Sequence, residues 1–369
     1  MEKPIRILHV FGRLDSGGAE SRTMDIYRSI DRTKIQFDFA IHTSDECYFS
    51  AEVRSLGGKI YSFPRFRRNN LFSYKKAWSQ FFLRYRSRYE IVHGHQTSTG
   101  FIYLNEAKKN GIRTRIAHAR NSDKDSAVKR LTTRLARFYA TELLAVSAPA
   151  AKSEFGERLM RSGTVKVIPN AININKYIFN ENIRLIKRKE FGLSDELAVV
   201  HIGRFHSQKN HHFLLKIFKE VLRKNPNSKL FIVGDGPLKD SIKQTIIELK
   251  IEGSVVLTGV RKDVADLLQA MDFLIFPSLF EGLPGVVLEA QAAGLPCIIS
   301  ESITDEVKVT DLVEYASLNE SEENWADKVL RKLDKSYRKD TFEEIANKGF
   351  DINSVAKWYE EFYLKLKGK

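Results

Sequence analysis

The chain alternates short apolar or β-branched runs with amphipathic stretches of helical length, and no other feature of the sequence constrains the fold as strongly. The short runs are typical of buried strands, and the longer stretches have the period of helices. This order predicts repeated βα units, and therefore parallel sheets with helices on both faces.

The expected strands form two series. The first covers residues 5–10, 37–41, 59–62, 91–93, 114–118, 142–146 and 165–168, and the second covers residues 198–203, 229–233, 254–258, 273–276 and 296–299. Residues 173–184 between them are polar and rich in asparagine, and 369 residues suffice for two domains. We predict an α/β fold of two Rossmann-like doubly wound domains, residues 1–175 and 176–350, facing each other across a ligand-binding cleft.

The positive charge is confined to the first half of the chain. The net charge is +14; residues 1–180 contain 32 lysines and arginines against 16 acids, whereas residues 181–369 contain 28 against 30. No acid occurs between Glu52 and Glu90, although this segment is rich in lysine and arginine. This distribution predicts an anionic partner, which is a membrane surface or, as an alternative, a nucleic acid. No nucleic-acid recognition motif accompanies the charge, so we expect no nucleic acid.

The cysteines and the apolar runs indicate the compartment. Cys47 and Cys297 are the only cysteines, which excludes a disulfide framework and fits a reducing cytosol. The first apolar run is short and contains Arg6, so we expect a strand there instead of a secretory segment. No uncharged apolar run approaches the ~20 residues of a membrane-spanning helix, so we expect none.

Glycines and cations mark two strand-to-helix loops. Gly17 and Gly18 lie where the first strand passes into a helix, and they either form a tight turn or let backbone N–H groups approach a phosphate. Arg204 and Lys209 follow Gly203 at the end of the second domain's first strand, where both cations can converge on one diphosphate. Alone, these two side chains would be ordinary solvated cations.

A third loop carries two carboxylates. Pro284 and Gly285 suit a helix start, which places Glu281 before the helix and Glu289 inside it. Two carboxylates there can hold sugar and ribose hydroxyls, while the N–H groups of Gly285, Val286 and Val287 face a phosphate or the transferring sugar.

Taken together, these motifs resemble those of a known family. G-R-x4-K at residues 203–209 and E-x7-E at residues 281–289, with Gly-Asp-Gly-Pro at 234–237 between them, resemble the retaining GT-B glycosyltransferases of family four. Residues 17–20 and 167–170 extend the likeness to nearly the full chain, and residues 8–10, 36–39 and 294–304 resemble bacterial exopolysaccharide and capsule transferases.

The resemblance implies roles for the second domain. Arg204 and Lys209 would clamp the diphosphate of a nucleotide sugar and stabilise the leaving group without a metal or other cofactor. Glu289 would accept hydrogen bonds from the ribose, and Glu281 would lie beside the donor sugar. The segment containing Thr258, Val260 and Arg261 would border the base.

It also implies roles for the first domain. Gly17 and Gly18 would close over the phosphates, and His118 would contact the donor sugar, although a lone strand histidine is otherwise more often structural. The family retains the anomeric configuration by front-face attack, so we assign no nucleophile or general base.

Three departures from the family pattern stand out. Asn170 is followed by Ala-Ile-Asn where relatives have Gly-Ile-Asp, and Arg120 replaces a histidine of close relatives. Asp123 and Asp125 mimic the metal-binding D-x-D motif of another fold, and we interpret them as a loop.

Two helices remain to be placed. Tyr74, Trp78, Phe81, Phe82 and Tyr85 recur at helical spacing among cations. This indicates a helix packed on the first sheet, an interfacial helix on anionic lipid, or both at once, since cations around a packed helix can still face lipid. The apolar stripe of residues 351–369 is expected to return to the first domain, as in relatives.

We therefore expect a cytoplasmic glycosyltransferase, a hexosyltransferase or N-acetylhexosaminyltransferase, peripheral on the inner face of the cell membrane. It would use a nucleotide-diphosphate sugar, UDP-linked, and a glycan or polyprenyl-diphosphate-linked acceptor in bacterial surface polysaccharide synthesis. A sugar-nucleotide epimerase or a phosphorylase on the same fold is the alternative, because a fold does not by itself define a reaction.

Overall fold

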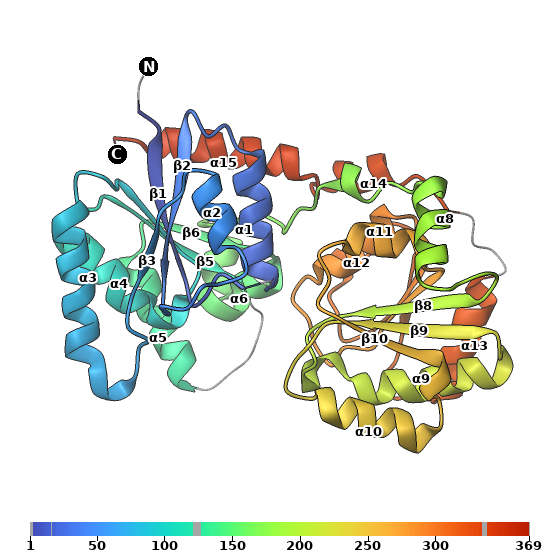
Figure 1. Cartoon of the computed structure of the whole chain (residues 1–369). Coiled ribbons are helices and arrows are strands. Elements are labelled where there is room, and N and C mark those ends of the chain that lie inside the picture. The colour runs from blue at the N-terminus through green and yellow to red at the C-terminus, as the bar shows by residue number, and fades with distance from the viewer. Residues whose placement is uncertain (1–2, 16, 121–126, 334–337, 369) are drawn as a thin grey trace. The chain divides into compact units, whose positions relative to one another are not determined.

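A computed structural model describes residues 3–15, 17–120, 127–333 and 338–368 (Figure 1). It divides into two compact units, which are residues 1–171 together with 349–369, and residues 172–348. Asp123 and Asp125 lie outside the described residues. Within the described ranges, no helix is long and apolar enough to cross a membrane.

The first unit contains a seven-stranded parallel sheet in the order β3-β2-β1-β4-β5-β6-β7. The strands are β1 (Ile5–Phe11), β2 (Ile35–Ile41), β3 (Ile60–Ser62), β4 (Ile91–Gly94), β5 (Thr114–Ala119), β6 (Glu142–Ala145) and β7 (Val165–Val167). The strand order reverses between β1 and β4, and open α/β sheets bind ligands at such a switch point.

Helices cover both faces of this sheet. They are α1 (Gly18–Ser29), α2 (Ser50–Ser55), α3 (Leu71–Tyr85), α4 (Thr97–Lys109), α5 (Ala127–Tyr139), α6 (Ala148–Phe155), α7 (Glu157–Arg161) and α15 (Ile352–Leu366). Ile7 packs in a core with residues of α1 and α15, whereas its neighbour Leu8 packs in a second core with residues of α3, α4 and α6. Successive side chains of a strand point to opposite faces, so the apolar runs of β1 fill both cores.

Helix α3 packs most of its aromatic stripe in the core of the first unit. Tyr74, Trp78, Phe81 and Phe82 are all buried, and they pack in the core on the α3 side of the sheet. The aromatic stripe therefore belongs to the core, and any contact of this unit with lipid must use other side chains. The last helix, α15, packs against α1 in the same unit, and Glu360 accepts a hydrogen bond from the N–H of Asp31.

The second unit contains a six-stranded parallel sheet in the order β10-β9-β8-β11-β12-β13. Its strands are β8 (Leu197–Ile202), β9 (Ser228–Val233), β10 (Val255–Gly259), β11 (Phe273–Phe276), β12 (Cys297–Ser300) and β13 (Val313–Ala316). Its helices are α8 (Glu181–Glu190), α9 (His211–Lys224), α10 (Lys239–Leu249), α11 (Val264–Ala270), α12 (Gly285–Ala292), α13 (Glu322–Leu333) and α14 (Phe342–Asn347). The switch point here lies between β8 and β11.

Both parallel sheets and the α/β class confirm the fold predicted from the alternating pattern. The prediction missed β13, a short edge strand whose residues Glu314 and Tyr315 are only half-buried. The division between the units falls at Ala171 and Ile172.

Candidate functional site

Lys209 and Glu281 meet at the switch point of the second sheet. Lys209 lies in the 3₁₀ turn Ser207–Lys209 after β8, and Glu281 lies in the loop between β11 and α12. The Nζ of Lys209 is 2.5 Å from an Oε1 of Glu281, and it also lies 4.5 Å from the ring centroid of Phe276. The side chains are only 17% and 11% exposed, so the pair is held in a defined geometry.

Hydrogen bonds tie these two loops together. The N–H of Leu279 donates to the carbonyl of Gln208 at 2.8 Å, and the amide of Gln208 donates to the carbonyl of Phe280 at 2.9 Å. Asn210, which adopts the left-handed conformation that ends the turn, donates to the carbonyl of Pro277 at 3.2 Å. The Lys209–Glu281 contact therefore rests on a backbone frame and does not depend on two flexible side chains alone.

Glycines allow a third loop to approach the same place. A Cβ on Gly234, whose φ is +141°, would lie 2.1 Å from the carbonyl oxygen of Gly203. A Cβ on Gly236 would lie 2.6 Å from the carbonyl oxygen of Phe205. At Gly203 itself a Cβ would crowd the side-chain carbons of Lys209 at 3.0 Å. Close backbone approach explains the glycines of the Gly-Asp-Gly-Pro and Gly-Arg motifs.

The other residues predicted in this unit lie in different environments. Arg204 is exposed, and its guanidinium makes no ion pair with any residue that the structure describes. Glu289 is 7% exposed inside α12, which begins at Gly285 after Pro284 as the sequence predicts. Val286 and Val287 lie in the first turn of this helix. The ammonium of Lys209 is paired, whereas the guanidinium of Arg204 is exposed in the same loop and can bind an anion.

The predicted base-bordering segment divides into two parts. The carbonyl of Gly259 accepts a hydrogen bond from the N–H of Gly234, which connects the Thr258 end of the segment to the loops described above. Val260 is exposed. The guanidinium of Arg261 pairs with Asp263 at 2.6 Å and with Glu190 of α8 at 3.3 Å. The guanidinium of Arg261 is thus already paired with two carboxylates on the side where a nucleotide base was expected.

In the first unit, Gly17 and Gly18 form the N-terminus of α1. Gly17 caps the helix in an extended conformation, and Gly18 is its first residue. A Cβ on Gly18 would have no atom within 4 Å, and its φ is not positive. Neither packing nor backbone conformation requires glycine at this position.

His118 belongs to a cluster of four buried histidines that the sequence analysis did not foresee. His9 lies on β1, His93 on β4, His95 directly after β4, and His118 on β5. Their Nδ1 and Nε2 atoms form two hydrogen bonds of 2.9 Å, one between His9 and His95 and one between His93 and His118. Burial lowers the pKa of all four rings well below the ordinary value, so they are neutral at pH 7.

A signal for this cluster is present in the sequence. A histidine stands near the carboxyl end of three strands that are neighbours in the sheet, and His9 and His93 are paired in register. Side chains that end adjacent parallel strands meet at one edge. The sequence does not give the order of the strands in the sheet. Only that order shows that β1, β4 and β5 are neighbours.

Arg120 closes one end of the cluster. Its guanidinium donates to His95 Nδ1 at 3.1 Å, to Asn170 Oδ1 at 2.9 Å and to the hydroxyl of Thr23 at 3.2 Å. Two of the departures from the family pattern, Arg120 and the Asn170 segment, therefore contact each other. Burial lowers the pKa of Arg120 from its usual value.

Three of these histidines have the spacing of a metal site. Nitrogen atoms of His9, His93 and His95 lie within 4.8 Å of one another. Five of their six ring nitrogens are, however, already used in hydrogen bonds, whereas Nε2 of His9 has no partner among the described residues, and the guanidinium of Arg120 adds positive charge beside them. We therefore interpret the cluster as a hydrogen-bonded network.

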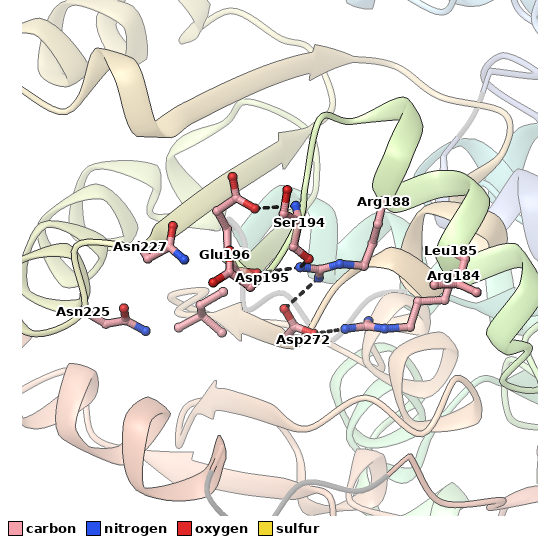
Figure 2. Close-up of a pocket in the computed structure, with 10 residues that line it drawn as sticks. Arg184, Leu185, Arg188, Ser194, Asp195, Glu196, Asn225, Asn227 and Asp272 are labelled. Carbon is pink, nitrogen blue, oxygen red and sulfur yellow. Dashed lines mark hydrogen bonds and ion pairs between the residues drawn. The ribbon is translucent and has the colours of Figure 1, made fainter.

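A cavity of about 490 Å³ in the second unit lies away from the predicted residues (Figure 2). It is lined by residues that precede β8, β9 and β11 and by two arginines of α8, whereas the Lys209–Glu281 pair follows β8 and β11. Figure 2 shows Arg184 and Arg188 turned toward Asp272, at 2.6 and 3.2 Å. Arg188 also donates to two carbonyls at 2.8 Å, so these cations hold the unit together.

Two parallel α/β units with polar loops at both switch points are the architecture of the GT-B fold. The fold of HepE from Anabaena, crystallised with UDP and glucose, is similar, with a TM-score of 0.81 over 98% of this chain and 99% of that chain. The two sequences are 19% identical, so this likeness concerns the fold alone.

Sequence comparisons define the family. Residues 16–176 match the model described as Glycosyltransferase Family 4, and residues 196–335 match Glycosyl transferases group 1. The EpsF protein of Bacillus subtilis (strain 168), provisionally named a glycosyltransferase, is 33% identical over 94% of this chain and 93% of its own length. The chain belongs to the family 4 glycosyltransferases and is a transferase enzyme.

Two further relatives have informative names. The capsular polysaccharide biosynthesis glycosyltransferase CapH of Staphylococcus aureus is 26% identical over 98% of this chain and 99% of its own length. An Escherichia coli UDP-Gal:alpha-D-GlcNAc-diphosphoundecaprenol alpha-1,3-galactosyltransferase is 31% identical over 61% of each chain.

Proposed function

We propose that this glycosyltransferase moves a sugar from a UDP-sugar, with retention of the anomeric configuration, to a glycan or polyprenyl-diphosphate-linked acceptor in the synthesis of a capsule or exopolysaccharide. The observation that carries the proposal is the exposed guanidinium of Arg204 in the same loop as Lys209, whose ammonium is held by Glu281. A guanidinium and an ammonium in one loop can both bind a diphosphate.

The proposal gives each of these residues a role. Glu281 holds the Lys209 ammonium in place before the donor arrives, so little reorganisation is needed when the diphosphate binds. Arg204 and Lys209 then stabilise the charge that develops on the leaving UDP, without a metal. Glu289, the fifth of the eight residues of α12, binds the ribose hydroxyls, and Gly18 gives the phosphates access to the N-terminus of α1.

The relatives support the substrate classes. HepE was crystallised with UDP-glucose, the Escherichia coli relative acts on a diphosphoundecaprenol-linked acceptor, and CapH takes part in capsular polysaccharide biosynthesis. These names motivate UDP as the nucleotide and a lipid-linked glycan as the acceptor.

Product analysis tests the reaction. The enzyme is incubated with an anomerically defined UDP-sugar, with and without a diphosphoundecaprenol-linked sugar, and the products are examined by NMR. We expect UDP to be released with acceptor and the new linkage to have the donor's configuration. Conversion of the donor to another UDP-sugar without acceptor would identify an epimerase, and an inverted linkage would exclude retention.

We also propose that the enzyme works on the cytoplasmic face of an anionic membrane and docks through α5. Leu131, Leu135 and Phe138 recur at positions i, i+4 and i+7 and are 59%, 40% and 73% exposed. We call these three residues the apolar ridge. Arg134 is exposed in the same stretch, and α4 packs against both α5 and the basic helix α3. Apolar side chains flanked by cations are the chemistry that binds anionic lipid headgroups.

Vesicle sedimentation tests this docking surface. We expect binding to phosphatidylglycerol vesicles and not to phosphatidylcholine vesicles, and a loss of about tenfold when the ridge is changed by Leu131→Ser, Leu135→Ser and Phe138→Ser. The matched control is Leu185→Ser with Ile186→Ser, an equally exposed pair on α8. Unchanged vesicle binding by the ridge variant would exclude this surface, and a change from dimer to monomer without any lipid effect would assign the ridge to self-association.

A further inference from the structure

Arg120 places a positive charge at the ligand-binding edge of the first sheet. It lies directly after β5, which pairs with β4, one of the two strands at the switch point. Ligands of open α/β sheets bind beyond the carboxyl ends of the strands, near such a point. A guanidinium remains protonated in proteins, so this edge carries a cation at neutral pH.

The groups that contact this guanidinium are all neutral. It donates to a ring nitrogen of His95, to the side-chain oxygen of Asn170 and to the hydroxyl of Thr23. No carboxylate of the described residues forms an ion pair with it, and Glu20 acts on it only from a longer distance. The side chain is half-buried, and a charge that has lost part of its hydration is stabilised by an opposite charge. An anionic ligand would supply that charge.

The guanidinium also has hydrogen-bond donors left for a ligand. It has five N–H groups, and three of them donate to the described residues. The Nε atom has a single hydrogen, which it donates to His95, so the two remaining N–H groups lie on Nη1 and Nη2. Two nitrogens of one guanidinium can bind two oxygens of the same phosphate.

Two other arginines of the first unit have partners that compensate their charge. Arg115, on the same strand, donates only to backbone carbonyls, and that of Tyr139 belongs to the partly negative C-terminus of α5. Arg22 of α1 forms an ion pair with Asp25 at 3.0 Å. Among the described residues Arg120 contacts neither a helix C-terminus nor a carboxylate, which distinguishes it from these structural arginines.

We propose that Arg120 binds the diphosphate of the acceptor, so that the first unit recognises the phosphorylated end of a lipid-linked substrate. The nature of the acceptor rests on the proposed function, whereas the binding of a diphosphate by Arg120 does not. The donor's own diphosphate has Arg204 and Lys209 in the second unit, so a further cation suits the second diphosphate of the reaction. His118, which the family resemblance places beside the donor sugar, lies two residues before Arg120, about 7 Å away along the chain. An acceptor held at Arg120 would therefore have its first sugar beside the donor sugar.

Acceptor kinetics on the full-length enzyme test the proposal. Two acceptors carry the same sugar, one on a prenyl diphosphate and the other on a neutral alkyl chain. We expect Arg120→Gln to raise KM for the diphosphate acceptor roughly 10- to 100-fold, because charge-assisted hydrogen bonds are lost. The KM values for the neutral acceptor and for the donor should not change. Arg120→Lys should regain part of the lost affinity, since an ammonium still binds phosphate, whereas a purely structural cross-link would be broken by both substitutions.

Arg115→Gln is the matched control, because it removes another arginine of β5 that forms no ion pair with the described residues. We expect it to leave the KM values of both acceptors unchanged, and thermal unfolding will verify that all variants fold. Equal increases of KM for the two acceptors in Arg120→Gln, or an increase confined to the donor, would overturn the proposal.

Calorimetry with geranyl diphosphate tests the binding step without catalysis. The titration uses the full chain with Arg204→Ala and Lys209→Ala, which removes the cations of the second unit. We expect geranyl diphosphate to bind this protein and Arg120→Gln to weaken the binding at least tenfold. Equal binding with and without the Arg120 guanidinium would overturn the proposal. Binding that depends on Arg120, in an enzyme that uses no diphosphate-linked acceptor, would instead refute the proposed acceptor alone.

Discussion

The two units place different chemistry at equivalent positions of their sheets. At the β1–β4 switch point of the first unit, histidines are buried, neutral and hydrogen-bonded to one another. At the β8–β11 switch point of the second unit, a lysine and a glutamate form a partly exposed ion pair beside an exposed arginine. The comparison teaches that the same fold can carry a network of neutral rings at one switch point and ionised side chains at the other.

The difference has a physical origin in burial. A buried ring avoids the cost of desolvating a charge by remaining neutral, and it then offers a donor or an acceptor according to its tautomer. A partly exposed loop keeps its charges hydrated enough to remain ionised, and so it can attract an anion.

The largest expected difference between the two units is in how much acidification destabilises each of them. Five buried histidines of the first unit have lowered pKa values, including His42 at about 4, whereas the second unit has only His201 and His211 among the described residues. A buried histidine whose pKa is lowered in the folded state binds a proton more readily in the unfolded state. Its contribution to the free energy of unfolding is therefore full above the unfolded pKa of about 6.5 and is lost as the pH falls below it. The free energy of unfolding falls by about 1 kcal/mol for each ring between pH 6.5 and 5.5.

Pulse proteolysis in urea at pH 7.5 and 5.5 measures this effect, because fragment masses identify the unit that unfolds. We expect the unfolding midpoint of the first unit to fall about twice as far as that of the second. Equal shifts of the two midpoints would show that the histidine cluster is not what distinguishes them.

The second-largest expected effect comes from removing the ammonium of Lys209. Lys209→Ala should lower kcat/KM about 10²- to 10³-fold, because a preorganised charge at the leaving group is lost. The protein should remain folded, since the loops are also held by backbone hydrogen bonds. Lys224→Ala is the matched control, because Lys224 also pairs with acids but at the end of α9. Activity within twofold of wild type for Lys209→Ala would remove Lys209 from the site.

The smallest effect concerns the first unit's glycine. Gly18→Ala should leave the free energy of unfolding unchanged or raise it by about 0.5–1 kcal/mol, since alanine is the better helix former and the Cβ meets no atom. The KM for the donor should nevertheless rise roughly tenfold if phosphates approach this backbone. Gly253→Ala, also in open space, should change neither quantity. An unaltered KM for Gly18→Ala would assign this turn no ligand.

The fold could be predicted because strands and helices have local sequence patterns. The contacts that the prediction missed join residues far apart in the sequence. The apolar runs that became β1 and β8 are recognisable from sequence alone, whereas β13 is short and half-buried and carries a weak signal. The contact of Lys209 with Glu281 spans 72 residues and was anticipated only through a family resemblance. The histidine cluster joins residues 86 positions apart, and Tyr363 lies 270 positions from His93, distances over which periodicity carries no information.

The most direct test of the account is a thermal-shift comparison of UDP-, GDP- and ADP-sugars on wild type, Arg204→Ala and Lys209→Ala. The account predicts that a UDP-sugar raises the melting temperature of the wild type by several degrees and that either substitution removes the gain. A wild type whose melting temperature no nucleotide sugar changes, or an Arg204→Ala variant stabilised as much as wild type, would contradict it.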